Sequence, residues 1–102
     1  MTTTNPHIPT NSAVASYIDG GGNSVIHVFV SDGYTVTEKV WSGGGWQTGL
    51  LSVRGHSVSA TAYTVGGMNC LRVYCIADDA ITEYGNDGGS GNGWYTGSFS
   101  YP

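Results

Sequence analysis

Apolar and polar positions alternate along the chain in short runs, and clusters of Gly, Asn, Asp and Ser separate these runs. The runs are rich in Val, Ile, Thr and Tyr, as is typical of β-strands bounded by turns. The pattern predicts eight strands, near residues 12–18, 24–31, 34–41, 45–51, 57–65, 69–76, 80–86 and 93–100. We therefore expect an all-β protein.

Several middle strands are apolar at both odd and even positions. The run Ile26-His27-Val28-Phe29-Val30 is the clearest case. A sheet with one face in water alternates more regularly, so this pattern favours sheets that are covered on both faces.

The chain carries one pattern twice. Three pairs of segments align at an offset of 45 residues: Ser12–Tyr17 with Ser57–Ala62, His27–Phe29 with Arg72–Tyr74, and Thr37-Glu38 with Thr82-Glu83. The segments Gly45–Gly49 and Gly93–Gly97 align at an offset of 48, which predicts a three-residue insertion around Asp87 to Gly91. The chain is therefore a tandem repeat of about 45 residues.

Each copy has the length and the four strands of a propeller blade. We expect residues 11–55 to form the first blade and residues 56–102 the second, after a tail or docking segment at residues 1–10. Two blades cannot close a ring, so copies of the chain are expected to associate head to tail. Three chains would complete a six-bladed β-propeller.

The charge of the chain excludes some functions. The net charge is −4, and Lys39, Arg54 and Arg72 are the only cations. Nucleic acids and anionic membranes require basic clusters, so a neutral ligand fits better. No stretch approaches the roughly 20 apolar residues of a membrane span, and no signal-peptide pattern is recognisable. We expect a soluble protein, whether secreted or leaderless.

The cysteines and histidines do not form a recognisable site. Cys70 and Cys75 lie five residues apart in one extended run, which places their side chains on opposite faces, so free buried thiols are expected. No CxxC is present, and the three histidines are scattered along the chain. The sequence predicts no metal and no cofactor.

Arg72 stands in the middle of an apolar run, where a cation must be paired or used for recognition. A turn at Ala77-Asp78 places Glu83 opposite Arg72 on one face of a hairpin. The turn Asp32-Gly33 does the same for His27 and Glu38 in the first copy. An Arg beside a carboxylate can hydrogen-bond several hydroxyl groups of a small ligand.

The tryptophans are expected on the faces of the sheets opposite to those that carry the glutamates. Glu38 and Trp41 are three residues apart on one strand, so they point to opposite sides, and each Glu must meet an indole from a neighbouring blade. Charged hydrogen-bonding groups together with aromatic rings suit a carbohydrate, whose hydroxyl groups need the former and whose C–H face packs on the latter. The sequence predicts a monosaccharide site between blades.

Together these runs resemble the fucose-binding lectins of the Aleuria type. The resemblance rests on five runs: Leu71-Arg72-Val73-Tyr74, Ile81-Thr82-Glu83, Gly93-Trp94-Tyr95-Thr96-Gly97, Val36-Thr37-Glu38-Lys39-Val40-Trp41 and Gly45-Trp46. It covers about 90 of the 102 residues. It implies a six-bladed propeller, built from trimers in the two-blade members, with a sugar site in each groove between blades. Fucosylated glycans are the implied partners, bound by a multivalent agglutinin.

The resemblance implies one complete site. Arg72 and Glu83 would hydrogen-bond the sugar, Trp41 and Trp46 would supply stacking and an indole N–H, and Ile26 would face the methyl group of the 6-deoxy sugar. By the chain order of the two-blade relatives, this site lies between two chains. A second site is degenerate and is expected to be weak or dead: it keeps Glu38 and Trp94, but has His27 and Asn86 where Arg and Trp are expected.

Three alternatives remain open. Arg72 and Glu83 could form a structural ion pair, and Trp46 and Trp94 could belong to the blade core. The chain could be an assembly module, such as an engineered or decayed propeller fragment with weak or no sugar binding. An enzyme is not expected, because a glycosidase needs two carboxylates flanking one bond, and Glu38 and Glu83 fall in different grooves.

Overall fold

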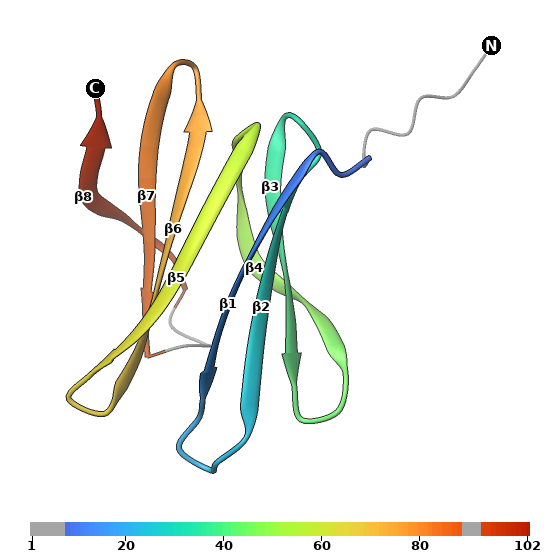
Figure 1. Ribbon diagram of the computed structural model, residues 1–102, viewed down its shortest axis with the longest axis vertical. Helices are drawn as coiled ribbons and strands as arrows, with labels where there is room; N and C mark the ends of the chain where they lie inside the picture. Colours follow the sequence, from blue (N-terminus) through green and yellow to red (C-terminus); the bar gives the residue numbers. More distant parts are fainter. Residues whose placement is uncertain (1–7, 89–92) are drawn as a thin grey trace.

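A computed structural model describes residues 8–88 and 93–102, and these form two four-stranded antiparallel sheets (Figure 1). The first sheet contains β1 (Asn11–Ile18), β2 (Ser24–Ser31), β3 (Thr35–Ser42) and β4 (Trp46–Arg54). The second contains β5 (Ser57–Val65), β6 (Met68–Ala77), β7 (Ala80–Asp87) and β8 (Tyr95–Tyr101). Each sheet follows chain order, so every connection within it is a hairpin.

The prediction of an all-β chain with four strands in each copy is confirmed. The predicted strands match the observed ones to within three residues at every end. Residues 1–7, which make up most of the predicted tail, lie outside the described residues. Residues 89–91 of the predicted insertion also lie outside them.

The predicted hairpin registers were wrong by two residues. His27 lies opposite Val40 rather than Glu38, and Arg72 lies opposite Gly85 rather than Glu83. A shift of two residues keeps each side chain on its face, because the side-chain period of a strand is two. Arg72 and Glu83 therefore share a face, as predicted, but as diagonal neighbours.

The loops explain the shift. The second loop is Asp78-Asp79, with φ values of 53° and 62°, the left-handed conformation that Asp tolerates and that two-residue hairpins require. In the first loop the Asp32 carboxylate accepts hydrogen bonds from the amides of Tyr34 and Thr35, at 3.0 and 2.9 Å. Asp32 therefore precedes the turn instead of forming it.

The alignment of the two copies also changes at the first strand of each sheet. Ala15 lies opposite His27 and Thr61 lies opposite Arg72, an offset of 46 residues where the sequence alignment gives 45. Tyr17 therefore corresponds to Tyr63 and not to Ala62.

The core lies between the two sheets, where β1 packs against β5. The first sheet contributes Ala15, Phe29, Val36 and Leu51, and the second contributes Val58, Leu71, Val73 and Cys75. These side chains alternate with residues that point away from the partner sheet, so each sheet has an inner and an outer face.

Both outer faces expose large apolar side chains. On the first sheet Trp46 is 52% exposed and Leu50 is 70% exposed. On the second sheet Phe99 and Tyr101 are 46% and 64% exposed. Exposed apolar side chains that gather on one face are typical of interaction surfaces.

The two cysteines lie on opposite faces of β6, as predicted. Both are free and buried. Cys75 faces the inner core opposite Val58, whereas Cys70 faces outward beside Asp87. Burial raises the pKa of the Cys75 thiol to about 11.

Candidate functional site

The four residues of the predicted degenerate site come together between the sheets. His27 on β2 and Glu38 on β3 come from the first sheet, whereas Asn86 on β7 and Trp94, which precedes β8, come from the second. All four line one cavity of about 600 Å³. The groove between neighbouring sheets thus holds the residues that the repeat predicted for it.

The Glu38 carboxylate in this groove already takes part in hydrogen bonds with three protein groups. Glu38 is 2% exposed, and its Oε1 accepts hydrogen bonds from Trp94 Nε1 and from the Leu51 amide, both at 3.2 Å. His27 Nδ1 lies 2.5 Å from Oε2, and because a carboxylate only accepts, this nitrogen carries the proton. Little accepting capacity remains for a ligand.

The rings in the groove pack on one another. His27 stacks between Tyr17 and Phe29, at centroid distances of 5.6 and 6.2 Å, and Trp94 meets the edge of Phe29 at 5.7 Å. The Tyr17 hydroxyl lies 3.3 Å from His27 Nε2. Among the described residues, Asn86 Oδ1 is a buried oxygen without a hydrogen-bond partner. Trp94 therefore belongs to the packing between the sheets.

The aromatic half of the predicted complete site lies on the outer face of the first sheet. Ile26, Trp41 and Trp46 occupy one row across β2, β3 and β4. The two indole rings are 5.7 Å apart and tilted by 58°. Trp41 and Glu38 point to opposite faces of β3, as predicted.

The charged half lies on the outer face of the second sheet, but Arg72 and Glu83 are bonded to other partners. Glu83 accepts a hydrogen bond from the Tyr74 hydroxyl at 2.7 Å and from the Phe99 amide at 3.1 Å. These bonds hold the pKa of Glu83 below its usual value. Arg72 instead pairs with Asp87, at 2.7 Å. The expected direct pair is therefore replaced by two neighbouring, separately held charges.

A bulge and a glycine make room for each glutamate. Glu38 alone on β3 faces the three residues 49–51 of β4, and Glu83 alone on β7 faces residues 97–99 of β8. A Cβ on Gly49 would collide with Glu38, and a Cβ on Gly97 would collide with Glu83. The glycine that ends each repeated Gly-Trp segment thus holds space for a carboxylate.

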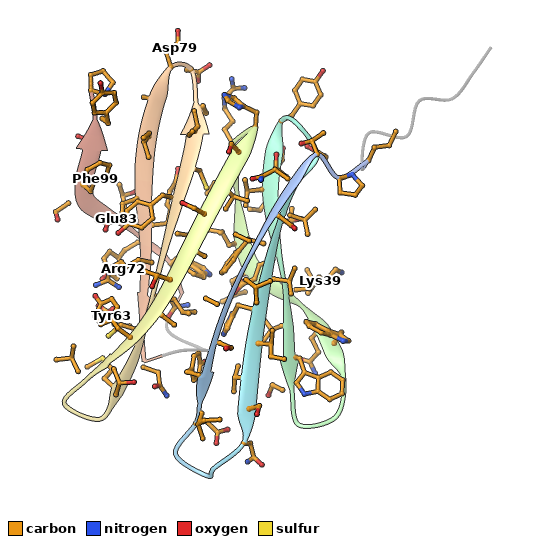
Figure 2. The ribbon with its side chains drawn as sticks, viewed as in Figure 1. Lys39, Tyr63, Arg72, Asp79, Glu83 and Phe99 are labelled. Atoms are coloured by element: carbon orange, nitrogen blue, oxygen red, sulfur yellow. The ribbon has the colours of Figure 1, made fainter. Side chains whose placement is uncertain are left out.

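The predicted complete site is split between the two outer faces. Figure 2 shows Arg72 and Glu83 on one side of the molecule and Lys39, which shares the outer face of β3 with Trp41, on the other. One chain therefore does not bring the four residues together.

The residues that the sequence did not single out are mainly tyrosines and one aspartate. Tyr63, Tyr95 and Asp87 surround Arg72, and Tyr74 holds Glu83. A comparison of the copies does give a signal, because Phe29, Ser42 and Gln47 occupy the positions corresponding to Tyr74, Asp87 and Tyr95.

No protein-family model matches the chain, and no curated protein is similar enough to count as a relative. Residues 8–88 and 93–102 contain no cluster of three metal-ligating side chains. Across these same residues there is also no helix of the length and apolar character that a membrane crossing needs.

Proposed function

We propose that the protein is a lectin that binds L-fucose or fucosylated glycans in a groove between two copies of the chain. Arg72 and Glu83 of one copy form one wall, and Trp41, Trp46 and Ile26 of the next copy form the other. Three copies, stacked head to tail, complete a six-bladed β-propeller.

One observation carries the proposal. His27 and Glu38 meet Asn86 and Trp94 across the two sheets of a single chain. The repeat counterparts of these residues, Arg72 with Glu83 and Trp41 with Trp46, lie on the two faces that a single chain leaves uncovered. Stacking a second copy with the geometry of the internal contact brings the counterparts into one groove.

The apolar surface supports the same stacking. A cavity of about 490 Å³ on the outer face of the second sheet is lined by Tyr74, Ile76, Ile81 and Phe99, among others. The corresponding region of the first sheet lies on its inner face, where Val73 and Cys75 of the second sheet pack against it. In the repeat, Val73 and Cys75 correspond to Val28 and Val30 on the outer face of the first sheet. Val28 and Val30 of the next copy would therefore fill the cavity.

The chemistry of the groove suits a neutral sugar. The guanidinium group donates and the carboxylate accepts hydrogen bonds, while the two indole rings can pack on C–H groups. Because Glu83 is held in its ionised form, uronic and sialic acids are disfavoured beside it. Ile26, in the same row as Trp41, offers an apolar contact for the methyl group of a 6-deoxy sugar.

A fucose titration by calorimetry, combined with native mass spectrometry, tests the proposal. We expect a trimer with one strong site per chain, and three sites on one particle would agglutinate glycan-coated cells through effective concentration. Two equal sites per chain would contradict the assignment of the His27 groove as degenerate. A fucosylated glycan array with a sialylated set as control measures the specificity.

A second candidate is an assembly module without sugar binding. The hydrogen bonds of Glu38 favour this role for the internal groove, because the three protein partners of the carboxylate link the two sheets and leave little capacity for a ligand. A closed trimer that stays silent on the glycan array would establish it. Enzymatic hydrolysis has no support, since Glu38 lies between the sheets and Glu83 on an outer face.

A further inference from the structure

Arg72 is held on three sides. Its Nη1 donates hydrogen bonds to the Leu71 carbonyl at 2.8 Å and to Asp87 Oδ1 at 2.7 Å. The rings of Tyr63 and Tyr95 lie 5.4 and 5.6 Å from the centre of the guanidinium group. The side chain is only 18% exposed, so its rotation is restricted.

Among the described residues, none accepts a hydrogen bond from the opposite edge of the guanidinium group. A guanidinium carries five N–H donors, and the hydrogen bonds just described use Nη1 alone. Within the described part of the chain, Nε and Nη2 have no acceptor. These two nitrogens form a planar fork that can hold two neighbouring oxygen atoms.

Asp87 is itself fixed by Tyr95. The Tyr95 hydroxyl donates to Asp87 Oδ2 at 2.6 Å. This hydrogen bond and the one from Arg72 hold the pKa of Asp87 below its usual value, so it is an anion at neutral pH. Asp87 can therefore compete with Glu83 for the guanidinium group.

The Glu83 carboxylate is hydrogen-bonded without a contribution from Arg72. Tyr74 and the Phe99 amide already donate to its carboxylate. In the first copy Phe29 stands in place of Tyr74, and Glu38 takes the hydrogen bond of His27 instead. There the positions of Asp87 and Tyr95 are occupied by Ser42 and Gln47. The restraining network is thus specific to the copy that keeps the arginine.

We propose that Asp87 and Tyr95 are positioning residues, which keep Arg72 from pairing with Glu83 and so present its Nε–Nη2 edge to two adjacent oxygen atoms of the sugar. This inference rests on the proposed function. It explains how an arginine and a glutamate that share one face remain available to a ligand instead of neutralising each other.

Replacing Asp87 by Asn tests the inference, because the amide keeps the shape of the side chain and removes its charge. Arg72 then turns toward Glu83, the nearest remaining carboxylate on that face. We expect fucose affinity to fall about tenfold, and Tyr95→Phe to produce a smaller loss in the same direction. The matched control is Asp78→Asn, which breaks the exposed Arg54–Asp78 pair far from the groove.

Nitrogen-15 NMR of the arginine side chains separates this inference from the proposed function. The chain has two arginines, so an Arg54→Lys variant assigns the Nε–H signal of Arg72. We expect that signal to be sharp without ligand in the parent protein, to shift on addition of fucose, and to move to a different position in Asp87→Asn, where Arg72 pairs with Glu83. Circular dichroism verifies that each variant is folded.

The outcomes are distinct. Equal fucose affinity and an unchanged Nε–H signal in Asp87→Asn would overturn the positioning role while leaving the lectin intact. A parent protein that binds no fucose would overturn the proposed function and, with it, the ligand part of the inference. The signal in Asp87→Asn would then still decide whether Asp87 restrains Arg72.

Discussion

Trp94 donates its indole N–H to Glu38 across the space between the two sheets, at 3.2 Å. Trp46 and Glu83 are the repeat counterparts of this pair, and they lie on the two outer faces of the same chain. The internal contact between the two sheets is therefore the pattern on which the proposed groove between copies is based, with Trp46 and Glu83 on its two walls.

Removing the guanidinium group should abolish sugar binding. Arg72→Ala deletes the charged donor of the proposed groove between copies, and we expect an affinity loss of at least about 100-fold, since hydrogen bonds to charged groups are the stronger ones. Calorimetry measures the loss, and native mass spectrometry should still detect the assembled ring. Arg54→Ala is the control, because its ion pair with Asp78 is 72% exposed on both sides. Retained binding in Arg72→Ala would place the site elsewhere.

The two repeat-related tryptophans should respond differently to substitution. Trp94→Phe removes a donor to the buried Glu38, so we expect the free energy of unfolding to fall by about 2 kcal/mol. Trp46→Phe, at a side chain that is 52% exposed, should change the stability of the single chain by less than about 0.5 kcal/mol but weaken fucose binding. Chemical denaturation in dilute solution measures both values. A destabilised Trp46→Phe monomer would mean that Trp46 belongs to the sheet core.

The paired glycines give a second matched comparison. Gly97→Ala pushes a methyl group into Glu83, so we expect weaker fucose binding and a small change in stability. Gly49→Ala pushes the same group into Glu38, which bonds to the second sheet through Trp94, so we expect the fold to be destabilised by about 1–3 kcal/mol while a folded fraction still binds sugar. Denaturation and calorimetry on both variants distinguish the two roles, and similar results for both would contradict the division into an internal tie and an outer site.

Acid should weaken the protein below the ordinary pKa of its carboxyl groups. The Tyr74 hydroxyl and the Phe99 amide lower the pKa of Glu83 from 4.5, and Tyr95 and Arg72 lower that of Asp87 from 3.8. A group with a depressed folded-state pKa stabilises the fold above its unfolded-state pKa and loses that contribution as the pH falls through the folded-state value. We expect a flat free energy of unfolding between pH 7 and about 5.5 and a decline below about 4.5. Glu83→Gln should flatten part of this decline, and an unaltered decline would assign it to other groups.

Cys75 should resist thiol reagents in the folded protein. Burial raises its pKa to about 11, so only about one thiol in a thousand is ionised at pH 8. We expect alkylation to follow global unfolding, with a rate that rises in denaturant. Mass spectrometry of labelled peptides measures it, with Cys75→Ser as the reference, and fast labelling in buffer would indicate local opening of the sheet core.

The strand pattern and the assignment of faces could be predicted from the sequence because both depend on the two-residue period of a strand. Placing Glu38 and Trp41 on opposite faces required only their spacing, and the structure agrees. Local turn chemistry was harder to interpret. Asp-Gly and Asp-Asp both allow more than one two-residue loop, and the hydrogen bonds of Asp32 select the one that moves the register by two residues.

The partners of Arg72 could not be predicted for the same reason. With the register shifted, Glu83 became a diagonal neighbour and Asp87 came within bonding distance on the other side. The offset in the first strand was also hidden, because the loop before β2 has five residues and the loop before β6 has two. Only after pairing is known does Tyr63 take the position beside Arg72 that Tyr17 takes beside His27.

In the proposed ring, each uncovered face of one copy meets the other uncovered face of the next copy, and this head-to-tail arrangement determines how copies would join. Adding one copy covers one face of each partner and leaves a pair that exposes the same two faces as a single chain. A dimer therefore still has two uncovered faces, and only the copy that closes the ring covers both of them. Assembly should therefore pass sharply from free chains to complete rings as concentration rises. A chain with one blocked face could still bind to an incomplete ring but would prevent it from closing, so a small fraction of such chains should lower the yield of complete rings.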